Sequence, residues 1–326
     1  MSGVYLTFLG LSFSSGPPPP IVLKKGIFAF GRNSSTVYST SNLVSNVGVV
    51  ATNTINEVGT ARAGLAAASF GGDKAIFAFG FTAFTFSSTP NLSSPTLNVS
   101  TSNRVSNVGV VETNTINEVG TARAGLAAAS FGGDKAIFAF GYTSTYVSTS
   151  NLVSNVGVVA TNTINEVGTA RRGLAAASFG GDRAIFAFGH NVAAVYSMSN
   201  LVSNIGVVET DVAAVANTEL KKDLAACSYG GDKAIFAYGS TSRVYKYSYY
   251  LVSNIGGVAA NRSGAGTPRA SLAASAYGDG QGIFAFGYNN VYLATSNLVS
   301  NVGVVATNTI NAVGTIRSEL AAASYG

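Results

Sequence analysis

Short runs of hydrophobic residues recur along this chain in a fixed order, separated by glycine-rich turns. The most regular run reads Ile-Phe-Ala-(Phe/Tyr)-Gly, and consecutive copies start 49, 61, 48, 50 and 48 residues apart. The copies begin at Ile27, Ile76, Ile137, Ile185, Ile235 and Ile283. Self-similarity at a nearly constant period predicts an array of similar structural units that bury their cores against one another.

Each unit has four short apolar segments with turn residues between them. In the second unit, residues 65–69 read Leu-Ala-Ala-Ala-Ser, a Gly-Gly-Asp-Lys turn follows at 71–74, and the Ile-Phe-Ala-Phe run comes next. In the first unit a third run spans 38–44, and Ser-Asn-Val-Gly at 45–48 turns the chain into a fourth run at 49–52. Such runs predict β-strands, and four antiparallel strands per unit are typical of one blade of a β-propeller.

The Leu-Ala-Ala-Ala-Ser segment has the smallest side chains of each unit. Its copies begin at Leu65, Leu126, Leu174, Leu224, Leu272 and Leu320. In a propeller the first strands of all blades converge on a central axis where bulky side chains would collide, so we assign this segment to the innermost strand. The Ile-Phe-Ala-Phe run is then the next strand, where neighbouring sheets stack and aromatic rings fill the space between them.

The two ends of the chain complement each other. Residues 320–326 form an innermost strand with no second strand after it, and residues 21–30 form a second strand with no innermost strand before it. An open array would instead need polar capping repeats. We therefore predict an all-β fold: a six-bladed β-propeller over residues 21–326, closed by its N- and C-terminal strands, with an extended arm at residues 1–20.

One unit is longer than the others. The extra residues, roughly 87–99, carry Pro90 and Pro95. Because insertions in repeat proteins collect in loops on one face, we expect a surface loop there.

Composition limits the possible functions. Only 10% of the residues are charged, the net charge is +5, and there is no tryptophan. Lys and Arg recur once or twice per unit without forming a run, which predicts a solvated rim and argues against nucleic-acid binding. No stretch of about 18 apolar residues predicts a membrane-spanning helix. The apolar residues 4–11 lack a preceding Lys or Arg, so no secretory signal is expected.

A basic residue lies three positions before the leucine of each innermost strand. These residues are Arg62, Arg123, Arg171, Lys221, Arg269 and Arg317. Together with a period of about 50 residues and a second strand that ends in glycine, this pattern resembles the kelch repeat, which forms β-propellers. The chain departs from that pattern because the kelch glycine pair is reduced to one glycine, as at Gly31, Gly80 and Gly141, and the kelch tryptophan is missing.

Two longer motifs also recur: Gly-Gly-Asp-Lys-Ala-Ile-Phe and Asn-Leu-Val-Ser-Asn-x-Gly-Val-Val. Over residues 21–326 they resemble tandem-repeat virion structural proteins of tailed bacteriophages. The resemblance implies a non-enzymatic structural protein of the virion, as a decoration, fibre or tail component or in host attachment. It also implies assembly in the host cytoplasm.

The segment before the repeats has its own character. Four prolines at 17–20 predict an extended, polyproline-like spacer. The residues ahead of it are apolar enough to favour burial, so we expect this arm to bind other virion or assembly proteins. Its predicted partner-binding residues are Tyr5, Leu6, Phe8, Leu9, Leu11 and Phe13.

The stretch between the second and third strands differs most from unit to unit. Its Tyr, Asn, Ser and Arg residues resemble the composition of antibody paratopes, although drift in unconstrained loops would also produce such variety. We predict that it shares one face with the connection between units and binds a host-surface glycan or protein there. The predicted recognition residues are Arg32, Asn33, Tyr142, Tyr146, His190, Asn191, Arg243, Tyr288 and Asn289.

Little in the sequence indicates catalysis. His190 is the single histidine, which cannot form a multi-histidine metal site, and Cys227 aligns with alanines of the innermost strands, so we expect a small core residue. The aspartates of the Gly-Gly-Asp turns repeat, whereas catalysis needs one asymmetric constellation. Glu166, five residues before Arg171, is expected to pair with it. We predict no enzyme activity, no cofactor and no membrane insertion. The alternative to a virion protein is a soluble carbohydrate-binding (lectin-like) or protein-interaction propeller.

Overall fold

The computed structural model describes residues 23–53, 59–86, 93–114, 119–162, 166–213, 219–242, 244–308 and 314–326. In these residues the fold is all-β, without helices, as expected from the strand-like pattern. Most strands belong to three-stranded antiparallel sheets, in which an alanine-rich strand, a middle strand and a third strand follow one another. The predicted recognition residue Arg243 and the predicted arm residues, Tyr5 to Phe13, lie outside the described residues.

The bounds of the strands repeat from sheet to sheet. The alanine-rich strands are β3 (Ala66–Phe70), β8 (Ala127–Phe131), β11 (Ala175–Phe179), β14 (Ala225–Tyr229), β19 (Ala273–Tyr277) and β22 (Ala321–Tyr325). The middle strands are β1 (Lys25–Ala29), β4 (Lys74–Ala78), β9 (Lys135–Ala139), β12 (Arg183–Ala187), β15 (Lys233–Ala237) and β20 (Gln281–Ala285). The third strands are β2 (Ser41–Val44), β7 (Ser102–Val105), β10 (Ser150–Val153), β13 (Ser199–Val202), β18 (Tyr249–Val252) and β21 (Ser296–Val299).

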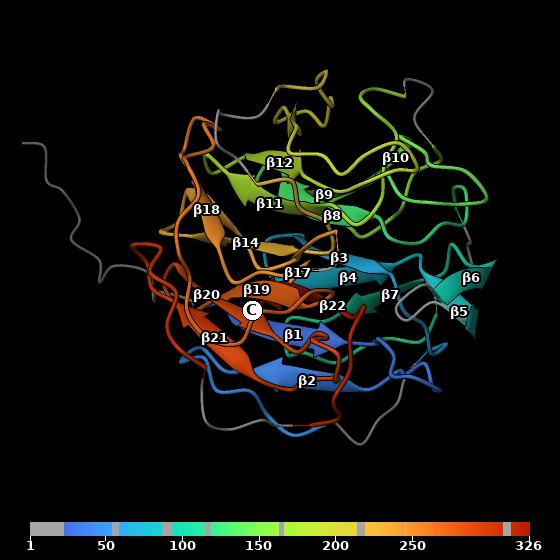
Figure 1. Ribbon diagram of the computed structural model, residues 1–326, viewed down its shortest axis with the longest axis horizontal. Coiled ribbons are helices and arrows are strands. Elements are labelled where there is room, and N and C mark those ends of the chain that lie inside the picture. The colour runs from blue at the N-terminus through green and yellow to red at the C-terminus, as the bar shows by residue number, and fades with distance from the viewer. Residues whose placement is uncertain are drawn as a thin grey trace, which may run out of the picture.

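The first and last strands of the described chain belong to one sheet. β1 lies between β2 and β22, and its Ile27 is opposite Leu43 on one side and Ala323 on the other. Figure 1 shows β22, β1 and β2 beside one another, although they come from opposite ends of the chain. The predicted pairing of the N- and C-terminal segments is therefore confirmed.

The alanine-rich strands contact one another in a cyclic order. β3 contacts β8, and the contacts continue through β11, β14, β19 and β22, which contacts β3 again. Two series of backbone hydrogen bonds follow the same cycle. One joins the residues before these strands, with Gly64 N donating to Glu319 O, Gly125 N to Gly64 O, Gly173 N to Gly125 O, Asp223 N to Gly173 O, Ser271 N to Asp223 O and Glu319 N to Ser271 O. The other joins the turns after these strands, with Gly71 N donating to Asp134 O, Gly132 N to Asp182 O, Gly180 N to Asp232 O, Gly230 N to Gly280 O, Gly278 N to Lys24 O and Gly326 N to Asp73 O.

The core lies between neighbouring sheets. Ile76 of β4 and Phe138 of β9 are fully buried and belong to one cluster, and the rings of Phe79 and Phe138 are 5.5 Å apart. Burial alternates along five of the six alanine-rich strands: in β3, Ala66, Ala68 and Phe70 are buried and the side chains between them are partly exposed, whereas in β19 Ala274 is buried as well. This period of two places one face of each such strand in the core and the other toward the centre of the cycle.

The predicted fourth strand does not form. The chain after Gly48 returns along β2 with one isolated bridge, Val44 to Val50, whose two backbone hydrogen bonds run from Ser45 N to Val49 O and from Ala51 N to Leu43 O. The side chain of Asn42 donates to Ala51 O at 3.0 Å, so a buried amide replaces the next rung of the ladder. The sheets of the described residues therefore have three strands and a short, irregular edge.

The insertion is a β-hairpin where a loop was expected. β5 (Phe81–Phe86) pairs with β6 (Ser93–Asn98), and Pro95 lies opposite Phe84 in the ladder. Proline lacks a donor but is compatible with a strand that has a free edge, which explains why its presence misled the prediction. The hairpin projects at the right of Figure 1. A smaller hairpin joins β16 (Ser240–Thr241) to β17 (Val244–Tyr245).

The six basic residues of the kelch-like pattern are buried, which corrects the predicted solvated rim for this group. The side chain of Arg123 has no exposed surface, and its guanidinium donates to Phe140 O at 2.8 Å, Thr121 O at 3.2 Å and Phe138 O at 3.3 Å. The same group lies 4.3 Å above the ring of Phe79, which follows β4 in the neighbouring sheet. Carbonyl oxygens and an aromatic face offset the cost of removing the charge from water.

The aromatic residue under each of the five buried arginines has an unusual backbone. Phe79 has φ of 66° and the following Gly80 has φ of 102°. A bulky residue in the left-handed region is strained, and the arrangement persists because the surrounding structure fixes it. The equivalent residues Phe30, Phe140, Phe188, Tyr238 and Phe286 have φ between 64° and 67°. In the five units that have arginine, the cation, the strained aromatic residue and the glycine thus form one repeated joint between sheets.

Candidate functional site

A narrow channel runs between the alanine-rich strands. Its cavity is about 150 Å³ and is lined by alanine and serine side chains of all six strands, with Lys24 and the glycines of the turns at one mouth. Ser69 Oγ donates to Ser324 O at 2.7 Å, and Ser130 Oγ donates to Ser69 O at 2.9 Å. These hydroxyls bond neighbouring strands, so the channel wall holds the sheets together and presents few groups capable of chemistry.

Cys227 is a core residue, as predicted. It is only 5% exposed, packs with Tyr229 and Ile235, and lies opposite Ile235 in the ladder. Burial raises the pKa of its thiol to about 12. A thiol with this pKa is protonated at neutral pH and is a poor nucleophile.

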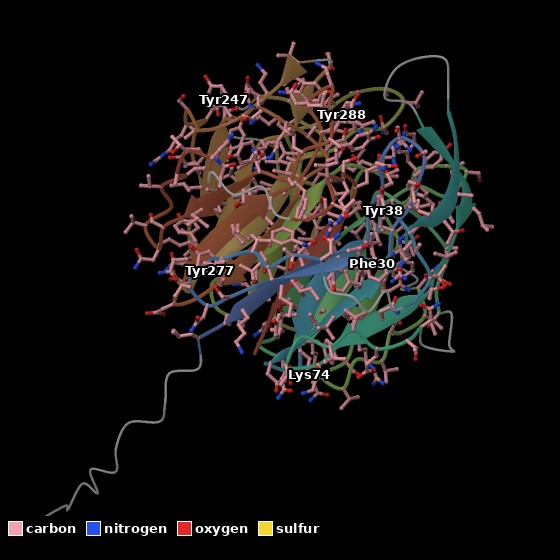
Figure 2. The ribbon with its side chains drawn as sticks, turned by 90° about the horizontal axis from the view of Figure 1, so that it is seen from below. Phe30, Tyr38, Lys74, Tyr247, Tyr277 and Tyr288 are labelled. Carbon is pink, nitrogen blue, oxygen red and sulfur yellow. The ribbon has the colours of Figure 1, made fainter. Side chains whose placement is uncertain are left out.

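The variable stretches meet the connections between units, which confirms the predicted sharing of one face. Arg172 N donates to His190 O and His190 N donates to Arg172 O, both at 2.9 Å. Equivalent bridges join Tyr142 to Ala124 and Tyr288 to Ala270. We call this side of the molecule the loop face. In Figure 2, Tyr288 of this face lies on the upper side of the molecule, and Lys74 of the Gly-Gly-Asp turns lies on the lower side.

A first cluster on the loop face combines Tyr142, Tyr146, Arg172 and His190. The two tyrosine rings are 5.1 Å apart, edge to face, and His190 is 6.2 Å from Tyr146. The Arg172 guanidinium lies 4.8 Å from the Tyr142 ring and 5.9 Å from the Tyr146 ring, and its Nε donates to His190 Nε2 at 3.4 Å. Three of these residues were predicted, whereas Arg172 was not.

His190 is uncharged at neutral pH. Burial, assisted by the positive charges of Lys222 and Arg172, lowers its pKa to about 4, although Asp223 acts in the opposite direction. The neutral ring accepts the hydrogen bond from Arg172, which a protonated imidazole could not do. Among the described residues, no group of three or more His, Cys, Asp or Glu side chains is arranged to hold a metal ion.

A second cluster forms at equivalent positions in the unit three further along the cycle. The rings of Tyr288 and Tyr292 are 5.0 Å apart, edge to face, and Tyr245 lies 6.2 Å from Tyr288. Arg32 occupies the position of His190 and binds Glu319 at 2.6 Å. Burial opposes charge on Arg32, but the Glu319 carboxylate leaves the arginine pKa above its usual value. The structure thus pairs two tyrosines with a neighbouring cation twice on the loop face.

The predicted recognition asparagines have local partners. Asn33 Oδ1 accepts hydrogen bonds from Ser35 N and Thr36 N, and its amide donates to Tyr38 Oη at 2.6 Å. Asn191 Oδ1 accepts from two backbone N–H groups in the same way. These Asx turns shape the loops. Beside them the cluster tyrosines and Arg172 are partly exposed, whereas Arg32 is buried in its pair with Glu319. Asn289 donates its backbone N–H to Val291 O at 2.9 Å.

The buried cations Arg171 and Lys221 have partners that the sequence did not indicate. Glu166 accepts a hydrogen bond from Thr149 Oγ1 at 2.9 Å, and Arg171 bonds to backbone oxygens and Asn200, so the expected Glu166–Arg171 pair does not form. In the fifth unit Lys221 replaces the usual arginine. It donates to Ser248 O at 2.8 Å and lies 5.0 Å from the Tyr250 ring, where other sheets have a buried asparagine.

Comparisons with known proteins add no assignment: no family model matches the chain, and no curated protein matches it. In the part of the chain that the structure describes, no helix is long and apolar enough to span a bilayer. The kelch-like and virion-protein resemblances remain predictions from the motifs.

Proposed function

We propose that this chain is a six-bladed, kelch-like β-propeller. Supporting this are six three-stranded sheets in the described residues, the cyclic contacts of their alanine-rich strands, and the two cyclic series of backbone hydrogen bonds. The β1–β22 pairing would then act as the closure of the ring. Among the described residues, each blade has three strands and an irregular edge in place of the fourth strand of a standard propeller blade.

We further propose that the propeller is a non-enzymatic virion structural protein that displays its loop face to a partner. The observation that carries this proposal is the pair of tyrosine–cation clusters, which are built from loops that differ between units on a core that repeats. Aromatic rings beside arginine give flat, adaptable contact area, as in protein-binding surfaces. In this proposal the partner is a host-surface glycan or protein, and residues 1–20 attach the propeller to other virion or assembly proteins.

Two experiments test this proposal. Imaging of the native particle with an antibody against the chain should label the particle, and deletion of residues 1–20 should reduce its incorporation. Binding of the purified chain to host cells should fall when Tyr142→Ala and Tyr288→Ala are combined, whereas Val192→Ser, an exposed change on the same face outside the clusters, should leave it unchanged. Absence of the chain from particles would contradict the virion structural role. Unchanged binding by the tyrosine variant would contradict the role of the loop face in binding.

The same clusters favour a second candidate, a soluble lectin-like propeller. Tyrosine rings beside a cation offer stacking surface and hydrogen-bond donors that suit an acidic sugar. Binding of the isolated chain to a glycan array, lost in the tyrosine variant, together with absence of the chain from particles, would favour this candidate.

A further inference from the structure

The turns that follow the third strands expose aliphatic side chains in every unit. The residue at the tip of the turn is valine or isoleucine in all six units and is between 65% and 75% exposed. These residues are Val47, Val108, Val156, Ile205, Ile255 and Val302. The residue two positions further on is also an exposed valine in five of the six units. We call these eleven side chains the aliphatic belt.

The fold does not require the belt. In the first unit the turn is held by Ser45 N donating to Val49 O and Gly48 N to Ser45 O, and Gly48 takes the positive φ of 81°. Val44 is buried in the core and Val50 packs against it, whereas Val47 and Val49 are 69% and 63% exposed. Turn tips normally carry Asn, Asp, Ser or Gly. Contiguous exposed apolar surface marks interaction sites in soluble proteins.

The belt surrounds the Gly-Gly-Asp turns, on the side opposite the loop face. A Cβ on Gly71 would meet the backbone oxygen of Asn155 at 2.9 Å, so the turn after one alanine-rich strand touches the belt turn of the next sheet. Gly48 packs in the same way on the ring of Tyr277. Figure 2 shows Tyr277 and Lys74 on the side of the molecule away from Tyr288. We call this side the turn face.

The centre of the turn face carries charges of both signs. Asp and a basic residue alternate in the turns, with Lys74 2.7 Å from Asp73 and Lys233 2.9 Å from Asp232. In the four turns that have such a pair, each side chain is between 38% and 47% exposed. The four pairs follow one another in the cycle, whereas the other two positions have Asp279 with Gln281 and Lys24 with Lys25. Where the two signs alternate, the surface is complementary to itself, because rotating one copy brings lysines opposite aspartates.

We propose that a second copy of this chain docks on the turn face, so that two molecules associate face to face about a two-fold axis. Such a contact is isologous, and each copy contributes the same belt and the same alternating charges. The belt side chains expose on the order of 1,000 Å², which exceeds the roughly 800 Å² per partner that a stable interface buries. The loop faces of the two copies then point outward in opposite directions.

Sedimentation equilibrium of the full chain over about two decades of micromolar concentration tests this inference. The wild type should sediment at twice its 33.1 kDa mass. A variant with asparagine at the six belt tips (Val47→Asn, Val108→Asn, Val156→Asn, Ile205→Asn, Ile255→Asn and Val302→Asn) should sediment as a monomer with an unchanged thermal transition, because asparagine suits the turn. The matched control, Val192→Asn with Val291→Asn, removes exposed valines from the loop face and should remain dimeric.

Hydrogen–deuterium exchange of the wild type tests the same dimer without relying on a variant that must fold. On dilution, backbone amides of the belt turns should exchange with deuterium faster, while those of the loop face should not change. A monomeric wild type throughout the range would overturn the proposal. A belt variant that stays dimeric would also overturn it and would assign association to residues 1–20 or to the loop face.

Discussion

Replacing Arg123 by alanine removes one joint between two sheets and should destabilise the protein strongly. Three hydrogen bonds from the guanidinium to backbone oxygens are lost, at about 1.5–3 kcal/mol each, and the contact with the Phe79 ring adds about 1–2 kcal/mol. The substitution also removes a buried charge, and this gain opposes the losses. Burial lowers the pKa of Arg123 to about 10, which corresponds to about 3 kcal/mol. The net loss in the free energy of unfolding is therefore on the order of 3–8 kcal/mol.

Chemical denaturation followed by tyrosine fluorescence measures this loss. Arg104→Ala is the matched control, because Arg104 makes only a surface ion pair with Glu112 at 3.0 Å and should cost less than about 1 kcal/mol. Arg123→Lys should cost about half as much as alanine, because one ammonium cannot reach all three oxygens. A loss below about 1 kcal/mol for Arg123→Ala, or equal losses for Arg123→Ala and Arg104→Ala, would refute the role of the buried cation.

Three further outcomes follow from the geometry. The pKa of His190 is lowered to about 4 in the folded protein, against about 6.5 when unfolded, so between these values only the unfolded chain takes up the proton. The free energy of unfolding should therefore fall by about 3 kcal/mol on acidification through this window, and the pH dependence of His190→Gln should lack that fall. Gly80→Ala should lower the free energy of unfolding by more than about 3 kcal/mol, because the new Cβ would lie 2.6 Å from Ala63 O. Gly72 also has a positive φ but has open space around it, so Gly72→Ala should lower the free energy of unfolding by only about 1 kcal/mol in the same denaturation assay. Cys227 should not react with a thiol reagent in the native protein and should react fully after unfolding; rapid native labelling would contradict its burial.

The architecture is largely readable from the sequence because each unit repeats the same local signals. Glycine-bounded runs gave the strand positions, and the alanines of segments such as 66–68 indicated a crowded centre. The complementary ends at 23–30 and 320–326 predicted the β1–β22 pair. In the first sheet the Asn42 amide takes the ladder position beside the Val44–Val50 bridge, and a sequence pattern does not distinguish an amide hydrogen bond from a backbone one. The fifth sheet has Tyr250 at this position and likewise has three strands among the described residues.

Other features depend on contacts between units, which spacing alone does not reveal. The five buried arginines, such as Arg62, lie over a left-handed aromatic residue of the preceding sheet, a conformation that the sequence pattern does not indicate. Arg172 was missed for the same reason: it lies over tyrosines of the previous unit, and other units have alanine, serine or lysine at its position. The Asx turns at Asn33 and Asn191 could have been predicted from the sequence, because each asparagine lies near the start of its loop, where its side chain can accept hydrogen bonds from the following backbone N–H groups.

The pairing of the two chain ends underlies the whole account, and a disulfide cross-link measures it directly. In a double variant, Lys25→Cys with Tyr325→Cys, the two positions are opposite each other in the β1–β22 ladder, while native Cys227 is buried. Mild oxidation of the folded protein should join residues 25 and 325 within one molecule, without raising the mass of the chain. Failure to form this link in folded protein, or a link found only between molecules, would contradict the closure of the sheet by both ends.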